Sequence, residues 1–190
     1  MEKHTEQAMR VANSMLAMNP IYIDTETTGV EDTDVVVELA VLDTDGGMLF
    51  ESLVKPIKPI PAEASKIHGI TDAKVVLSPD WTKVWPEVTE IFKDRVAGFF
   101  NAAFDIRMIR QSCGLSGIAW AHPFVDDFCV MELFARYYGE VDPRWGSFRW
   151  KNLAFAGRYF QLPEPNSHRA KDDAFLTKLV LEKMAEGFQP

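Results

Sequence analysis

The chain has 190 residues, of which 47% are hydrophobic and 12% aromatic, enough to bury one substantial core. Its formal net charge of −8 argues against a protein that coats nucleic acid without specificity, because that binding mode needs Lys and Arg to neutralise phosphates. The apolar runs are far shorter than the roughly 20 residues of a membrane span, and the N-terminus lacks the apolar core of a signal peptide. The sequence therefore predicts a cytoplasmic protein with no membrane partner.

Hydrophobic periodicity and turn residues predict the elements in chain order. They are a helix over 5–17, strands at 21–23, 35–42 and 48–54, helices over 62–67 and 81–93, a strand at 96–100, a helix over 102–112, a short strand at Val125, and helices over 128–138, 149–159 and 169–186. A meander of three strands followed by alternating helices and strands predicts an α/β fold with a mixed sheet and packed helices. We expect residues 1–19 to form an N-terminal helical extension and residues 20–187 to form one domain.

The charged residues are unevenly distributed along the chain. Residues 21–54 are rich in carboxylates and contain no Lys or Arg, whereas residues 136–171 carry more Lys and Arg than acids. This pattern fits a surface where cations lie beside a polyanion, but an ordinary solvated surface fits it equally well.

Asp24 and Glu26 directly follow the first apolar strand. Alternate residues of a strand face the same side, so both carboxylates can point at one ion, and hard oxygen ligands favour magnesium or manganese. In a chain this acidic, most pairs of this kind are solvated surface. The position at the end of a buried strand favours a functional site.

Two further polar segments each open a helix. Asn101 is a good N-cap residue, and Asp105 lies one turn later on the same face, where an acid is also favourable for the helix dipole. His168 precedes Asp172 and Asp173 at the start of the last helix, and only one of these two acids can face the sheet edge. Taken separately, both segments fit ordinary helix starts, and His168 fits a surface residue.

Together the three segments resemble the exonuclease motifs of the DEDDh family, the DnaQ-like group that includes proofreading subunits of polymerases and has a ribonuclease H-like fold. The resemblance rests on residues 24–29 (Asp-Thr-Glu-Thr-Thr-Gly), on residues 101–105 (Asn-Ala-Ala-Phe-Asp), and on His168 followed after four residues by Asp173. Lesser matches lie at residues 37–40, 67–71 and 125–126. The whole resemblance covers the chain from about Ile21 to Met184.

The resemblance implies a central mixed five-stranded sheet with helices on both faces. It also implies a 3'–5' exonuclease that hydrolyses the terminal phosphodiester bonds of single-stranded DNA or RNA and releases nucleoside 5'-monophosphates. By the same likeness, two divalent ions, Mg²⁺ or Mn²⁺, are bound by four carboxylates, Asp24, Glu26, Asp105 and Asp173. His168 is the general base, a role that suits imidazole because it titrates near neutral pH.

The resemblance further implies contacts of Thr27, His68, Asn101 and Phe104 with the terminal nucleotide. His68 also fits a turn histidine, and Phe104 also fits plain core. The implied partners are the 3' ends of nucleic acids and, in addition, either a polymerase chain or a second copy of this chain. Phe100 and Asp127 depart from the family pattern, which has His and Thr there in many members; neither is an implied metal ligand.

Three alternatives remain beside these expectations. Residues 24–28 also resemble the start of aspartyl-phosphate phosphatases, which need a second Asp where this chain has Glu26. A non-enzymatic binding module would be indicated by a missing ligand, but all the implied ligands and the histidine are present. Residues 144–151 interleave cations with aromatic residues. This pattern suits the binding of a single-stranded nucleic-acid tail, but aromatic residues at this spacing more commonly belong to the core of the following helix.

Overall fold

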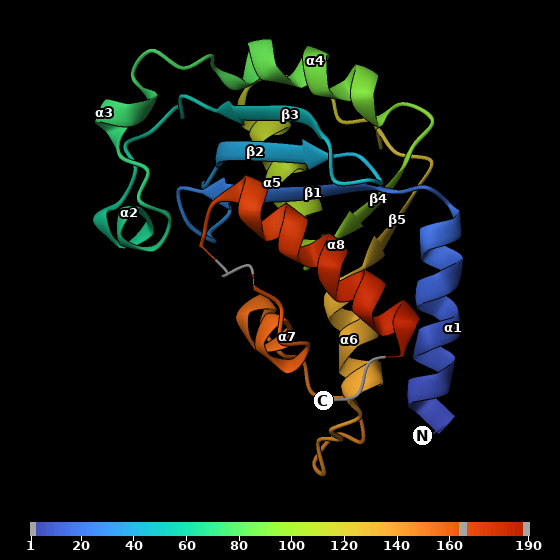
Figure 1. The fold of residues 1–190 in the computed structure, drawn as a ribbon. Coiled ribbons are helices and arrows are strands. Elements are labelled where there is room, and N and C mark those ends of the chain that lie inside the picture. The colour runs from blue at the N-terminus through green and yellow to red at the C-terminus, as the bar shows by residue number, and fades with distance from the viewer. Residues whose placement is uncertain (1–2, 164–166, 188–190) are drawn as a thin grey trace.

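A mixed five-stranded sheet forms the centre of the molecule in the computed structural model, which describes residues 3–163 and 167–187 (Figure 1). The strands are β1 (Ile21–Thr27), β2 (Val36–Leu42), β3 (Met48–Leu53), β4 (Val96–Phe99) and β5 (Asp126–Cys129). They lie in the order β3-β2-β1-β4-β5. The pairs β1–β2 and β2–β3 are antiparallel, while β1–β4 and β4–β5 are parallel. The expected mixed five-stranded sheet is thus confirmed.

Helices cover both faces of this sheet, as the resemblance implied (Figure 1). On one face lie α1 (Lys3–Ala17), α6 (Val130–Tyr138), α7 (Leu153–Tyr159) and α8 (Ala170–Glu186); on the other lie α4 (Trp81–Phe92) and α5 (Ala102–Leu115). The short helices α2 (Ala62–His68) and α3 (Asp72–Val75) lie beyond the end of β1. Strand β1 serves both layers, because Tyr22 packs among α6 and α8 while Ile21 and Ile23 pack with α4 and α5.

The N-terminal helix belongs to the helical layer beneath the sheet. Ala8 and Ala12 of α1 are buried in the same apolar cluster as residues of α6 and α8. The hydroxyl of Thr5 donates to the carbonyl of Tyr137 at 3.1 Å. Among the described residues, no helix combines the length and apolar character that crossing a bilayer requires.

Several element boundaries differ from those predicted. Strand β1 continues to Thr27 because Asp24 and Glu26 still pair with β2, and α6 begins at Val130 because residues 126–129 pair with β4. Val125 lies just before β5. Helix α7 begins only after Asn152, whose side chain accepts a hydrogen bond from the Phe155 amide. Helix α5 continues past its predicted end to Leu115, and α3 was not predicted.

Candidate active site

Asp24 and Glu26 reach the same face of the sheet because they alternate along β1. Tyr22, two residues before Asp24, packs on the face covered by α8, and the alternation directs both acids to that face as well. Both side chains are half-buried. The residue between them, Thr25, faces the opposite layer, where α5 begins. Strand β1 thus presents two carboxylates toward α8 and one hydroxyl toward α5.

Asp105 is fixed to β1 by this hydroxyl. Its Oδ1 accepts hydrogen bonds from the Thr25 amide at 3.1 Å and from the Thr25 hydroxyl at 2.7 Å. The carboxyl group is buried in the first turn of α5, immediately after β4. The side chain of Asn101 makes no capping hydrogen bond, so the interpretation of this residue as an ordinary side-chain cap is wrong.

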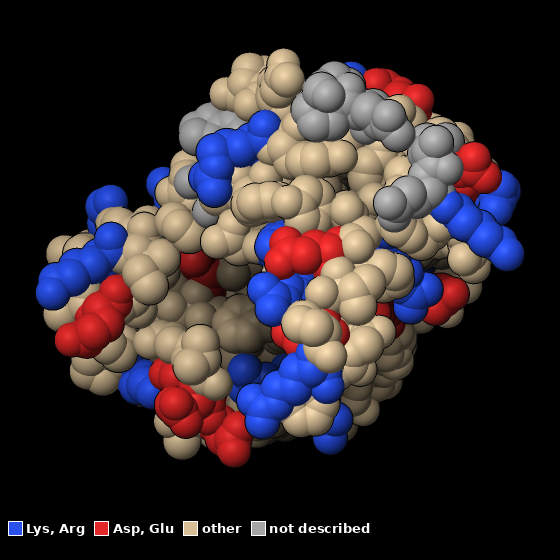
Figure 2. All heavy atoms as spheres, turned by 90° about the horizontal axis from the view of Figure 1, so that it is seen from below, with Lys and Arg blue, Asp and Glu red and all other residues tan. Residues whose placement is uncertain are grey.

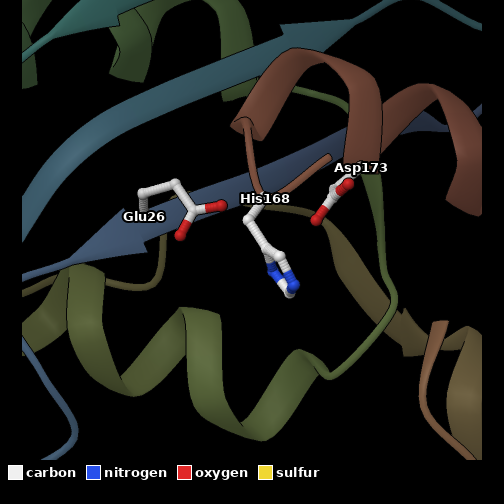
Figure 3. A group of neighbouring side chains, drawn as sticks. All are labelled: Glu26, His168 and Asp173. Atoms are coloured by element: carbon white, nitrogen blue, oxygen red, sulfur yellow. The ribbon is translucent and has the colours of Figure 1, made fainter. Parts of the chain in front are cut away.

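His168, Glu26 and Asp173 converge from two elements. One ligand atom from each lies within 4.8 Å of the others, and Figure 3 shows the three side chains around a common space. Asp173 is buried in the first turn of α8, and its Oδ1 accepts a hydrogen bond from the Ser167 amide at 3.2 Å. His168 is exposed and has a left-handed backbone with φ of 54°. The neighbouring Asp172 is partly exposed and instead accepts a hydrogen bond from the Ser167 hydroxyl at 2.7 Å.

A buried ion pair holds the segment that carries His168. Glu38 of β2 is 1% exposed, and its carboxylate pairs with the guanidinium of Arg169. The same carboxylate accepts hydrogen bonds from Arg169 Nε at 3.1 Å and from the Ala170 amide at 2.9 Å. The start of α8 is therefore tied to the strand beside β1, which sets the position of His168 relative to Glu26. Sequence patterns did not point to this pair.

The crowded carboxyl groups favour their protonated forms. Burial raises the pKa of Asp24 well above its ordinary value, and nearby carboxylates, Asp105 first among them, raise it further. Burial raises the pKa of Glu26 to about 8, with Asp173 the strongest of the neighbouring charges that act in the same direction. Burial also raises the pKa of Asp105 to about 7, although the hydrogen bonds from Thr25 oppose the rise. Such a cluster is short of positive charge.

This shortage predicts how the stability of the metal-free protein depends on pH. Because the folded pKa values of Glu26 and Asp105 lie above their unfolded values, the folded state holds protons that the unfolded chain has already released. Stability present near pH 5 is therefore lost progressively as the pH rises to about 8. Urea unfolding in chelator at both pH values measures this loss. Added Mg²⁺ should remove most of it, and a metal-independent pH profile would contradict the assignment.

Two of the expected nucleotide contacts line a cavity next to Glu26. This cavity has a volume of about 630 Å³ and is lined by Glu26, Thr27 and His68, among others. His68 is buried, and its Nδ1 accepts a hydrogen bond from the Ile70 amide at 3.0 Å, so Nε2 carries the proton that it donates to the Thr27 carbonyl at 3.2 Å. Both ring nitrogens are therefore engaged within the protein, as in the alternative of a turn histidine.

The same cavity has apolar walls that the sequence patterns did not indicate. Val30 and Ile67 line it and are 63% and 59% exposed. The loop that carries Val30 is held by Asp34, which accepts hydrogen bonds from the Thr28 hydroxyl and the Glu31 amide and pairs with Lys58. A Cβ at Gly29 would lie 2.5 Å from Asp34 Oδ2, so glycine is required there. The two apolar side chains are held at the mouth of the cavity.

The remaining motif residues occupy mixed environments. Phe104 is half-buried, packs on the α4–α5 side of the core, and has the Arg107 guanidinium 5.5 Å from its ring centroid. Phe100 is buried core, and Asp127 faces His122 at 3.1 Å. In the cation-aromatic segment, Trp145 and Trp150 are 72% and 65% exposed, so the alternative that its aromatic residues are core is wrong for these two.

Comparison with known proteins identifies the family. The RNase_T exonuclease model matches residues 21–181. An uncharacterised exonuclease of Escherichia phage 186 is 36% identical over 182 residues and covers 93% of each chain. The DNA polymerase III epsilon subunit of Treponema pallidum is 30% identical over 156 residues, covering 80% of this chain and 69% of its own. Among solved structures, exonuclease X in complex with 5'-overhanging duplex DNA has a TM-score of 0.63 and 26% identity, covering 87% of this chain and 90% of its own. The chain therefore belongs to the RNase_T exonuclease family, in its DnaQ-like, DEDDh group with a ribonuclease H-like fold.

Proposed function

We propose that this exonuclease removes nucleotides from the 3' end of single-stranded DNA or RNA and releases nucleoside 5'-monophosphates. The observation that carries the proposal is the convergence of Glu26, His168 and Asp173, with ligand atoms within 4.8 Å of one another beside the carboxyl groups of Asp24 and Asp105. A carboxylate cluster alone is a cation site. The histidine at its margin adds a group that can accept a proton.

The donor set fits two divalent cations, Mg²⁺ or Mn²⁺. All four proposed ligands, Asp24, Glu26, Asp105 and Asp173, supply carboxylate oxygens, which these hard cations prefer. The raised pKa values of three of them indicate that the folded site favours added positive charge. When bound, a pair of such cations stabilises the attacking and the leaving oxygen of phosphodiester hydrolysis.

The protein's own groups have separate roles in this reaction. His168 is exposed at the edge of the site and accepts a proton from the attacking water. The Glu38–Arg169 pair holds the backbone from which the imidazole projects. The hydrogen bonds from Thr25 hold Asp105 in one orientation, so the site is formed before substrate arrives.

The cavity beside Glu26 accommodates the terminal nucleotide. Thr27 and His68 form part of its wall, and the exposed side chains of Val30 and Ile67 give the base apolar surfaces on which to pack. Asn101 and Phe104 do not line this cavity, so their contact with the terminal nucleotide rests on the family resemblance; the Asn101 side chain is not used for capping α5. A pocket of this kind takes an unstacked base, which favours single strands over duplex.

The proposal predicts digestion from free ends only. A circular single-stranded DNA should remain intact under conditions in which the same molecule, linearised by one cut, is degraded to mononucleotides. A blunt duplex should be degraded more slowly than the linear single strand, because its terminal base must first be unpaired. Gel analysis with internally labelled substrates measures all three rates on DNA and RNA. Internal cuts in the circle would instead indicate an endonuclease.

The polymerase chain or second copy expected as a partner remains a prediction. Its support is the likeness to an epsilon subunit of DNA polymerase III.

A further inference from the structure

A groove between α1, α5 and α6 has a volume of about 950 Å³. Val11 and Met15 of α1 form one wall, Ile106, Arg107 and Arg110 of α5 form another, and α6 contributes Arg136. We call this hollow the α1–α5–α6 groove. It is separate from the 630 Å³ cavity, whose wall includes Glu26 and His68.

The α1–α5–α6 groove adjoins the catalytic site at two points. Ala102 and Ala103 line the groove and belong to the same first turn of α5 as Asp105. Arg107 also lines it and donates a hydrogen bond to the carbonyl of Val30 at 3.2 Å. Val30 in turn lines the cavity beside Glu26. A strand whose 3' end enters that cavity can therefore continue into the groove without leaving the protein surface.

The groove combines arginine side chains with an apolar floor. Arg110 and Arg136 are exposed, and neither forms an ion pair with another residue in the described parts of the chain. The lining also holds three acids. Asp127 already faces His122 at 3.1 Å, Glu132 lies one helical turn before Arg136, and Asp32 is exposed. Figure 2 shows the lower face of the whole molecule, which is hollowed; acidic side chains lie inside the hollow, and side chains of both charge signs lie along its border.

From this geometry we infer that the α1–α5–α6 groove binds the part of a single-stranded nucleic acid that lies upstream of the bond being cut. Arginines pair with phosphates, and bases lie against apolar surface, which is the combination that non-specific single-strand binding uses. Helix α1 lies outside the residues that match the family model, 21–181, so one wall is added by a part of the chain that the family match does not include. The inference rests on the proposed function and names the surface that holds its substrate.

The test compares substrates that reach the groove with one that does not. The double variant Arg110→Ala/Arg136→Ala should bind an oligonucleotide of about 15 nucleotides at least about tenfold more weakly. The slope of log K against log salt should become less steep by about 1.4, since each lost phosphate contact removes about 0.7 on a single strand. Fluorescence anisotropy measures both quantities in an Asp24→Asn background, which prevents digestion. Arg158→Ala, which removes an exposed arginine outside the groove, should change neither.

A matched pair on α1 tests the added wall. Met15→Glu places a negative charge in the groove and should weaken binding of the longer oligonucleotide, whereas the neighbouring Ser14→Glu, on an exposed residue outside the groove, should not. Thermal unfolding checks that both variants remain folded. With Asp24 intact, hydrolysis of a dinucleotide should be unaffected by the arginine or α1 changes, because it is too short to reach them.

Two different failures can be told apart. Unchanged affinity and salt slope in the Arg110/Arg136 variant would overturn the groove assignment and leave the exonuclease proposal standing. The same conclusion would follow if these arginines bound a protein partner and their removal did not change oligonucleotide binding. A wild-type chain that hydrolyses neither the dinucleotide nor the longer strand would overturn the proposed function itself.

Discussion

Asp24→Asn and Asp173→Asn should each lower the turnover of single-stranded substrate by about 10⁴-fold or more and leave the protein folded. Several kcal/mol of transition-state stabilisation depend on the cations that these carboxylates are proposed to bind, and about 1.4 kcal/mol corresponds to each tenfold change in rate. The fold should persist because the substitution keeps the shape of each side chain and relieves repulsion in a cluster whose pKa values are already raised. Steady-state rates and circular dichroism measure the two parts of this prediction.

Asp172→Asn provides the matched control. This neighbour of Asp173 is partly exposed and hydrogen-bonds to the Ser167 hydroxyl, so its substitution should leave turnover within about twofold of wild type. Wild-type enzyme in excess chelator should lose activity as completely as the Asp24 variant does, and added Mg²⁺ or Mn²⁺ should restore it. Full activity in chelator would refute the metal assignment.

His168→Ala should lower turnover by about 10²–10⁴-fold, the usual contribution of a general base. The Michaelis constant should change little, because the carboxylates and the terminal-nucleotide cavity are untouched. Steady-state kinetics on single-stranded substrate measures both quantities.

His122→Ala is the corresponding control, since His122 is also on the surface but faces Asp127 away from the cluster. On a dinucleotide, which does not reach the α1–α5–α6 groove, it should retain the wild-type rate. If His168→Ala behaved in the same way, the histidine would be an ordinary surface residue and the base would have to be sought elsewhere.

The features predicted well from sequence are those encoded by neighbouring residues. Asp24 and Glu26 lie in the second half of a buried strand, and Asp105 follows Asn101 at a helix start, so local patterns located both segments. The start of α7 was misplaced because Arg149 and Lys151 form ion pairs with the preceding loop, both with Glu140, and are not part of a helix. The Glu38–Arg169 pair joins positions 131 residues apart, and no local pattern reports such a contact.

The cavity that Val30 and Ile67 line could not be predicted from local sequence patterns either. Each is an ordinary apolar residue in the sequence. The two line one cavity only because α2 packs on β2 through Ala64 and Val37 and is joined to β1 by the His68–Thr27 hydrogen bond. The family resemblance supplied the roles of His168 and the four carboxylates, whereas the chain's own patterns left a helix cap and a surface histidine as alternatives. The structure excludes the side-chain cap at Asn101 and shows His168 beside Glu26 and Asp173.

The ion pair between Glu38 and Arg169 also sets the electrical neutrality of the site. Glu38 lies opposite Glu26 in the β1–β2 register, so its side chain shares the face that holds the proposed ligands. Arg169 cancels this additional charge, and the four remaining carboxylates, when ionised, would be balanced by the two divalent cations proposed above. A neutral residue at position 169 would leave one negative charge in excess, and the site would then retain a proton or attract a further cation. Under the proposed function, the number of cations bound therefore depends partly on an arginine that is not itself a proposed ligand.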